Sequence, residues 1–253
     1  MGRVVLAVAV VVLAAGCGGG DNEPSATGTG TTTAPSKTTD VRVYWLRDGK
    51  VWPARREVEE TEAVATAALL ELQRGPTEQE SMELGFDTAM PDESIQLDSL
   101  SITDGVAHYG SSEELSNEAL AQVAYTLTQF PTVESVEIEG RRYTRADFED
   151  LTPAILVESP LSFETVASPL RATGTANTFE AVFNYELTDT DGRIVAEDFV
   201  MATSGTGERG TFEFTVPFKV NFDGVGSLIV FELSAKDGSR INLAEIPVRM
   251  QAS

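Results

Sequence analysis

Cysteine, histidine and tryptophan are scarce in this sequence, which has one, one and two of them among 253 residues. A single cysteine cannot form an intramolecular disulfide, so the fold has to be held together by its core alone. No histidine-rich metal set is present, and neither HExxH nor GxSxG occurs. These are the usual signatures of metallohydrolases and serine hydrolases. The sequence therefore predicts no cofactor, no metal site and no catalytic residue of these classes.

Positive charge is also scarce. Lysine and arginine together number 18 against 40 aspartate and glutamate residues, which gives a formal net charge of −22. So acidic a surface repels nucleic acid and anionic lipid head groups, and it favours solubility over nonspecific association. We expect no nucleic-acid partner, and the charge favours a monomer when the protein is free.

Long apolar runs are missing as well. The longest, residues 4–15, follows a short start that contains Arg3, and it is shorter than the roughly 20 residues of a membrane-spanning helix. A charged start followed by a short apolar stretch is typical of an export signal. Residues 1–16 are therefore expected to be a signal peptide, and the chain is expected to be exported.

The only cysteine, Cys17, comes directly after this stretch. The residues Leu13-Ala14-Ala15-Gly16-Cys17 resemble the lipobox of bacterial lipoproteins. The resemblance implies cleavage after Gly16 and attachment of a diacylglycerol, and often a further acyl chain, to Cys17. Two acyl chains anchor a protein stably where one is marginal. The expected location is the extracytoplasmic face of the cell membrane, with a plain secreted protein as the alternative.

Residues 18–40 consist almost entirely of Gly, Thr, Ser, Pro and Ala with a few charged residues. Such a segment cannot bury enough apolar surface to offset the entropy of ordering it. Residues 17–40 are therefore predicted to be a lipidated cysteine and a disordered tether.

Residues 41–150 carry the signals of a mixed α+β domain. Residues 41–53 predict two strands around an Asp-Gly turn. Apolar residues recur at helical spacing within 61–76 and again within 116–131, and a hairpin is predicted between these helices. Residues 133–145 predict one closing strand, so two helices would cover one face of a small sheet. The acidic cluster of Glu57, Glu59, Glu60 and Glu62 is predicted to be the solvated start of the first helix.

Several segments of this region resemble the GerMN domain of sporulation and spore-germination proteins and of many bacterial lipoproteins. They are LLELQRGPTEQE, TAMP, SITDGVAHYGSSEEL and AQVAYTLTQFPTVESVEIEGRRY. The resemblance implies an interaction domain of the cell envelope without a catalytic motif. Its relation to ring-building modules leaves self-association open.

Residues 151–253 lose the helical period. Phe179, Ala181, Phe183, Tyr185 and Leu187 are predicted to share one strand face, and Phe212, Phe214, Val216 and Phe218 another. Short strands with Asp-Gly turns between them predict a β-sandwich. This part resembles the immunoglobulin-like domain that accompanies GerMN in such lipoproteins.

Three other motifs have ordinary structural explanations. Residues 205–210 fit GxGxxG but lead into a predicted strand, whereas a dinucleotide site needs a helix there. We interpret them as a flexible connection between strands. Asp189 and Asp191 lack the further ligands of a calcium loop and predict a hairpin turn. His108 lies in a predicted strand, where a structural role is favoured over general-base catalysis.

Trp45 and Trp52 flank the first Asp-Gly turn and are the candidate partner contacts of the chain. An exposed tryptophan at a strand edge can serve as a platform for a sugar or a protein. The alternative, which we favour, is that they pack on the helix face that contains Ala65 and Leu69.

Together these observations predict a non-enzymatic, lipid-anchored binding or scaffold protein of the bacterial cell envelope. Its partner would be an envelope protein or peptidoglycan. The alternatives are a cell-wall carbohydrate-binding protein and, third, a hydrolase that uses a pair among the many carboxylates.

Overall fold

The computed structural model describes residues 37–91, 100–111 and 114–252, and residues 36–253 form one compact unit. The expected signal peptide, Gly16, Cys17 and nearly all of the expected tether lie outside the described residues. Within the described ranges, no helix is long and apolar enough to cross a membrane.

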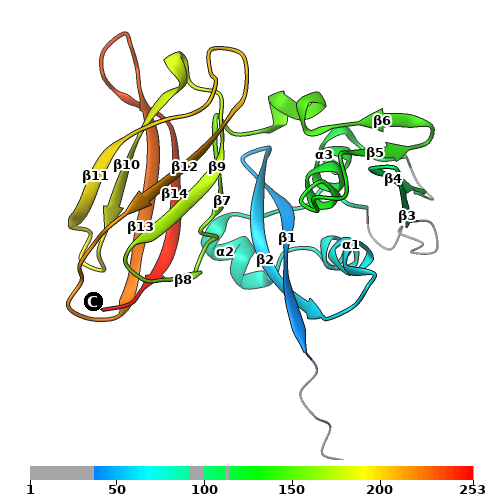
Figure 1. Ribbon diagram of the computed structural model, residues 1–253, viewed down its shortest axis with the longest axis horizontal. Coiled ribbons are helices and arrows are strands. Elements are labelled where there is room, and N and C mark those ends of the chain that lie inside the picture. The colour runs from blue at the N-terminus through cyan, green and yellow to red at the C-terminus, as the bar shows by residue number, and fades with distance from the viewer. Residues whose placement is uncertain (1–36, 92–99, 112–113, 253) are drawn as a thin grey trace, which may run out of the picture. The chain divides into compact units, whose positions relative to one another are not determined.

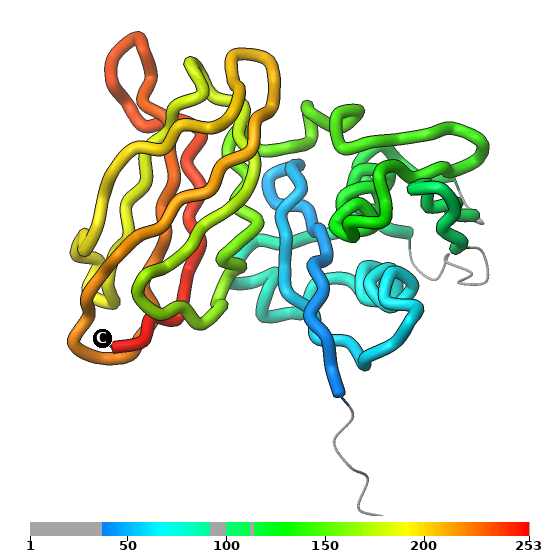
Figure 2. The backbone as a smooth tube through the Cα atoms, in the orientation of Figure 1, coloured from blue at the N-terminus to red at the C-terminus, as the bar shows by residue number. Residues whose placement is uncertain are grey.

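In its described residues the N-terminal domain contains two sheets and three α-helices, followed by a 3-10 segment. Its elements are β1 (Thr38–Arg47), β2 (Lys50–Glu59), α1 (Val64–Arg74), α2 (Glu78–Leu84), β3 (Leu100–Thr103), β4 (Val106–Tyr109), α3 (Asn117–Leu127), β5 (Ser135–Ile138), β6 (Arg141–Tyr143) and η2 (Arg145–Leu151). β1 starts three residues inside the segment that we expected to be tether. The chain then crosses through η2 to the second domain (Figures 1 and 2).

The first hairpin is longer than the sequence predicted. Asp48 and Gly49 adopt the positive φ angles expected of the turn, at 52° and 70°. However, β2 continues to Glu59, so Glu57 and Glu59 belong to a strand and do not start a helix. The strand continues because its alternation does, with Val58 buried between two exposed glutamates. The expectation that this cluster is solvated is confirmed, but its place at the start of a helix is wrong, because Glu60 and Glu62 also lie before α1 and outside it.

Both predicted helices are present. α1 buries its predicted face of Ala65, Ala68, Leu69 and Leu72, although it starts at Val64 and has no acidic residue in its first turn. α3 begins as expected, with the Ser116 hydroxyl accepting the Ala119 N–H at 3.1 Å. α3 is buried almost all round its surface because it packs against α1, β1 and β5.

The arrangement of strands differs from the single small sheet that we expected. β1 and β2 form a sheet of their own, and a separate sheet has the order β3-β4-β5-β6. Residues 133–145, which we expected to form one closing strand, form a hairpin of the two strands β5 and β6. α2 was missed because it buries only Leu84 and so carries no apolar period. Its sequence signal is a capping box between Thr77 and Glu80, in which each side chain meets the other's backbone N–H.

The C-terminal domain is a β-sandwich, as predicted. Its elements are β7 (Ile155–Ser159), β8 (Thr165–Val166), β9 (Leu170–Ala176), η3 (Phe179–Ala181), β10 (Val182–Thr188), β11 (Ile194–Met201), β12 (Gly210–Val216), β13 (Gly224–Leu233) and β14 (Arg240–Met250). One sheet has the order β11-β10-β13-β14-β8 and the other β12-β9-β7. Phe183 and Phe212 meet in the core with ring centroids 4.9 Å apart. Phe179 and Ala181 lie before the strand in η3, so their predicted place on its inner face is wrong.

Candidate functional site

The two tryptophans lie in the core. Trp45 and Trp52 are cross-strand partners in the first hairpin, and they are 0% and 8% exposed. They share one apolar cluster with Ala65 and Leu69, and the Arg47 guanidinium covers Trp52 at 3.8 Å from the ring centroid. Neither ring is available as a platform, so the packing alternative is confirmed and the candidate partner contact is not supported.

The other singled-out side chains have structural surroundings. The Asp189 carboxylate accepts the N–H groups of Asp191 and Arg193, both at 2.9 Å, which confirms the hairpin turn. His108 lies on β4 with its Nδ1 at 3.3 Å from Glu137 Oε1. Within the described ranges, no group of three histidine, cysteine, aspartate or glutamate side chains could hold a metal ion.

The GxGxxG segment leads into β12, as the sequence predicted. A Cβ at Gly205 would lie 2.5 Å from the Thr178 carbonyl oxygen, so the glycine permits close packing against the start of η3. The loop is tied down, because Thr206 N–H donates to Thr178 O and Gly207 N–H donates to Asn177 Oδ1, each at 2.9 Å. Our interpretation of this segment as flexible is therefore replaced by that of a packed connection.

Polar side chains of α3 and of Gln129, just past its C-terminal end, cover the outer edge of β1. The Gln129 amide accepts the Arg42 N–H at 2.7 Å and donates to the Arg42 carbonyl, so it acts like a neighbouring strand. Thr126 Oγ1 accepts the Tyr44 N–H at 3.2 Å, and Gln122 donates to the Tyr44 carbonyl at 2.9 Å. These bonds satisfy the hydrogen-bonding groups of polar side chains that are buried at the helix. They also hold the free edge of β1 against α3.

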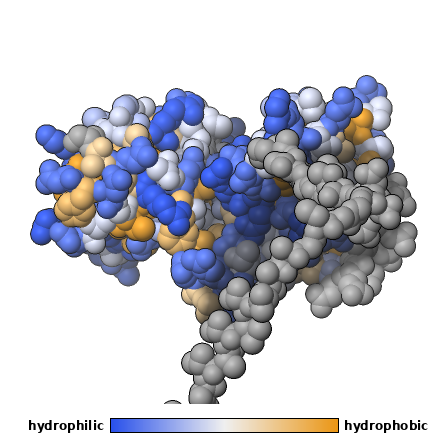
Figure 3. Space-filling model, turned by 90° about the horizontal axis from the view of Figure 1, so that it is seen from below, coloured by the Kyte–Doolittle hydropathy of each residue, from blue (hydrophilic) through white to orange (hydrophobic). Residues whose placement is uncertain are grey.

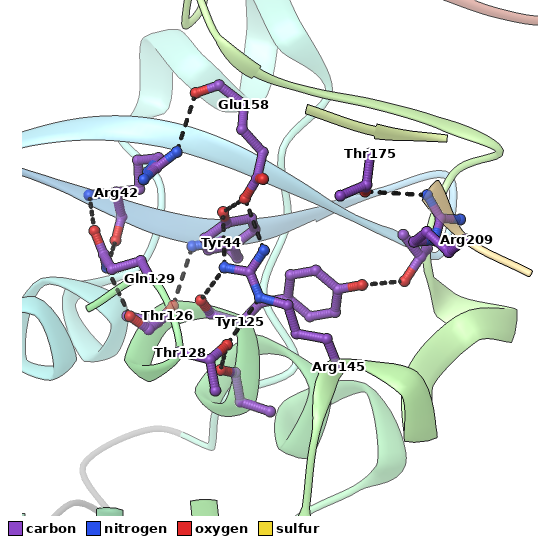
Figure 4. A network of polar contacts seen from close by, with 12 residues as sticks. Arg42, Tyr44, Tyr125, Thr126, Thr128, Gln129, Arg145, Glu158, Thr175 and Arg209 are labelled. Carbon is purple, nitrogen blue, oxygen red and sulfur yellow. Dashed lines mark hydrogen bonds and ion pairs between the residues drawn. The ribbon is translucent and has the colours of Figure 1, made fainter. Parts of the chain in front are cut away.

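A cluster of four side chains joins this part of the N-terminal domain to the sandwich, and we call it the junction network: Arg42, Tyr44, Arg145 and Glu158. Arg145 Nη1 donates to Glu158 Oε1 at 2.8 Å, and the Tyr44 hydroxyl donates to the same oxygen. Arg42 Nη1 donates to the Glu158 carbonyl at 3.4 Å. Figure 4 shows these side chains converging on Glu158 from β1, from the start of η2 and from β7.

Arg145 is the centre of the network. Its Nε donates to Thr128 Oγ1 at 2.8 Å, and its Nη2 lies 3.3 Å from both the Tyr44 hydroxyl and the Tyr125 carbonyl. Its guanidinium also faces the Tyr125 ring at 4.6 Å from the centroid. Arg145 and Glu158 keep only 25% and 13% of their side-chain surface exposed. The pair is therefore largely buried, and Arg145 uses four of its five N–H donors.

The environment holds the network in one charge state. Burial by itself would raise the pKa of Glu158, but the Arg145 charge and the Tyr44 hydroxyl hold that pKa below its usual value. Burial, together with the Glu158 charge, raises the pKa of Tyr44. At neutral pH Glu158 is therefore an anion and Tyr44 a neutral hydrogen-bond donor, as expected of a network that stabilises the structure.

A second ion pair, between Arg209 and Glu149, also connects the two domains. Arg209 donates to both Glu149 carboxylate oxygens, at 2.8 and 2.9 Å, and to the Pro153 carbonyl at 2.9 Å. Asn177 of the sandwich donates to Glu149 at 2.9 Å. Glu149 belongs to η2 and Arg209 to the packed GxGxxG loop. Two ion pairs therefore connect the η2 region to different parts of the sandwich, and Figure 4 places Arg209 next to Thr175.

An open cleft of about 780 Å³ runs beside the junction network. Its lining comes from both domains and includes four arginines. These are Arg42 of β1, Arg55 of β2, Arg171 of β9 and Arg249 of β14. A second hollow, of about 500 Å³, shares Arg42, Gln129 and Glu158 with it.

Sequence reasoning missed both the network and the cleft. Arg145 and Glu158 form no recognised motif, and Tyr44 is separated from Glu158 by 114 positions. The only signal was the presence of charged residues next to strand ends, which is common in an acidic protein.

Each part of the chain is similar to one known family. Residues 42–143 match the family model described as sporulation and spore germination. Residues 154–239 match the family model of the immunoglobulin-like domain of bacterial spore germination. No curated protein matches this chain. Arg145 and Glu149 fall between the two matched segments, and Glu158 falls inside the second.

Two solved structures show limited similarity. The tandem GerMN domains of the sporulation protein GerM from Bacillus subtilis match with 24% identity and a TM-score of 0.35, over 44% of this chain and 43% of that one. This chain thus covers less than half of that protein. CopC from Methylosinus trichosporium OB3b matches with 14% identity and a TM-score of 0.28, over 39% of this chain and 94% of that one. The chain therefore contains one segment similar to the sporulation and spore germination family and a following segment similar to the immunoglobulin-like domain of bacterial spore germination.

Proposed function

We propose that the chain is a non-enzymatic binding or scaffold protein, anchored through a lipid on Cys17 at the extracytoplasmic face of the cell membrane. The observation that carries the proposal is the junction network, which binds two interaction-type domains to each other through the buried Arg145–Glu158 pair. Fixing the two domains against each other favours binding by a surface that both domains form, because no entropy is then lost in ordering the domains when a partner binds.

The geometry around the titratable groups agrees with a role in binding. The pKa shifts of Tyr44 and Glu158 have structural causes, which are burial, the Arg145 charge and the hydrogen bond between the two groups. His108 pairs with Glu137 at the surface. Cell-wall carbohydrate binding remains the second candidate class, but the burial of Trp45 and Trp52 removes the observation that motivated it. A hydrolase is third.

The test is a crosslinking pull-down from native membranes of the source organism. The wild-type chain is compared with Cys17→Ala, which removes the acceptor thiol, and with Ser25→Ala, a matched change in the same tether. We expect a defined envelope protein with wild type and Ser25→Ala and its loss with Cys17→Ala, together with release of the chain from membranes. Recovery of cell-wall fragments alone, equally with all three forms, would refute the scaffold proposal and support cell-wall binding.

A further inference from the structure

The cleft of about 780 Å³ beside the junction network is lined by more basic than acidic side chains, whereas the whole chain is acidic. The whole sequence has 40 acidic and 18 basic residues, whereas the cleft is lined by four arginines and three carboxylates. Figure 3, which views the molecule from below, shows hydrophilic surface between the sandwich on the left and the N-terminal domain on the right. A local excess of arginine on so acidic a protein makes this the place where an anionic group is least repelled.

The three carboxylates of the cleft are already engaged. Asp40 pairs with Arg55 at 2.8 Å, and Glu158 pairs with Arg145, which is not part of this lining. Glu164 accepts the Leu161 N–H at 2.8 Å.

Two of the arginines have neutral carbonyl groups as hydrogen-bond partners, although the charge of Arg42 also helps to lower the pKa of Glu158. Arg42 and Arg249 donate to the carbonyl oxygens of Glu158 and Phe163, and neither forms an ion pair with a carboxylate within the described residues. A guanidinium whose partners are neutral carbonyls retains donors and a full charge for a ligand. Arg171 is exposed and is held in place by two hydrogen bonds to Glu213 outside the cleft, both at 2.7 Å. The arginines therefore come from both domains in fixed positions.

We propose that this cleft binds a short acidic segment of a partner protein, through carboxylates that pair with Arg42, Arg249 and their neighbours. The proposal rests on the binding function proposed above and names its site. Carboxylates match the planar donor fork of arginine. A short segment is favoured over a long polyanion, because a longer chain would leave the cleft and come within a Debye length, about 8 Å, of the surrounding acidic surface. Phe130 and Phe163, which also line the cleft, offer apolar contact to the side chains of a peptide.

The test measures peptide binding to the full-length protein, purified from membranes in neutral detergent at low salt. The probe is a fluorescein-labelled peptide of alternating Asp and Ala, about eight residues or roughly 26 Å long when extended. Its control is the same peptide with Asn in place of Asp. We expect the acidic probe to bind about tenfold more tightly than the control, with affinity falling as salt is raised.

Arg249→Gln is expected to weaken the acidic probe by about fivefold, because it removes one carboxylate partner. Arg171→Gln is expected to weaken it less, because two hydrogen bonds to Glu213 already engage that guanidinium. Arg193→Gln is the matched control, since it makes the same change of charge in the exposed β10–β11 turn. It is expected to stay within about twofold of wild type.

Equal binding of the two peptides, or unchanged binding by both cleft variants, would overturn the proposal. Binding of purified peptidoglycan that the acidic peptide does not reduce, and that Arg249→Gln weakens, would also overturn the proposal, because the cleft would then bind cell-wall material. If the Cys17-dependent partner is still captured in any of these cases, the cleft assignment fails while the proposed scaffold function stands. If no envelope protein is captured but the acidic peptide still binds in the cleft, the proposed scaffold function fails while the cleft assignment stands.

Discussion

Replacing Arg145 by Met tests whether the junction network stabilises the fold. Methionine fills much of the same space but leaves Glu158 as an anion, in a site where its side chain is 13% exposed. Breaking a buried ion pair by removing one partner costs about 3–5 kcal/mol, and the residual exposure of both groups favours the lower end. We expect a loss of about 3 kcal/mol in the free energy of unfolding.

The assay is urea unfolding at pH 7, followed by tryptophan fluorescence and by far-UV circular dichroism. Both tryptophans lie in the first hairpin, so the fluorescence reports the N-terminal domain. With a slope of about 2 kcal/mol per molar urea, the midpoint should fall by about 1.5 M. Arg193→Met is the control. Its ion pair with Asp191 is exposed, and the expected change is below about 0.5 kcal/mol.

A triple variant separates the cost of an unpaired charge from the cost of lost packing. Tyr44→Phe, Arg145→Met and Glu158→Met together remove both charges and the hydroxyl that would lose its acceptor. We expect this variant to lie within about 1 kcal/mol of wild type, since apolar replacements of a whole buried pair are often neutral. The reasoning is refuted if Arg145→Met alone costs less than about 1 kcal/mol, or if the triple variant is as unstable as the single one.

The remaining predictions concern pH, a loop and a helix cap. The pKa of Glu158 is held below its unfolded value of about 4.3, so its contribution to stability is present above that pH and lost as the pH falls through the lowered value. Urea unfolding between pH 7 and pH 3 should show this loss, and Glu158→Gln should flatten it. Gly205→Ala should destabilise the sandwich by about 1–3 kcal/mol, because its Cβ would overlap Thr178 O, and a wild-type melting temperature would contradict the packed loop. Thr77→Ala removes the capping box of α2 and should cost about 1 kcal/mol, whereas Thr61→Ala, before α1, should cost less.

Local and periodic signals account for the part of the fold that the sequence could predict. The Asp48-Gly49 turn, the buried face of α1 and the Ser116 cap all depend on residues within a few positions of each other. α2 escaped because its stability comes from a capping box and from the Arg56–Glu80 ion pair at 2.6 Å, and not from an apolar stripe. The division into two sheets was also missed, because α3 and the following Gln129 cover the edge of β1 with amides and a hydroxyl that no hydrophobic period reveals.

The candidate site could not be read from the sequence for the same reason. Each of its arginines lies in an ordinary strand, and only the packing of the two domains brings Arg42, Arg171 and Arg249 to one cleft. In a chain with 40 acidic residues many arginines have an acidic residue nearby in sequence, as Arg42 has Asp40, so charge patterning carries little information about which arginines remain unpaired in space.

The chemistry of the junction suggests what it contributes besides stability. Apolar side chains could join two domains as firmly, but they tolerate sliding and rotation, whereas Arg145 requires an acceptor at each of several fixed directions. Glu149 and Arg209 set a second such requirement beside the first. Two directional ties define the orientation of the sandwich against η2 more closely than either alone. The same orientation brings the arginines of β1 and β2 opposite those of β9 and β14, so the junction network and the proposed binding cleft depend on one arrangement of the chain.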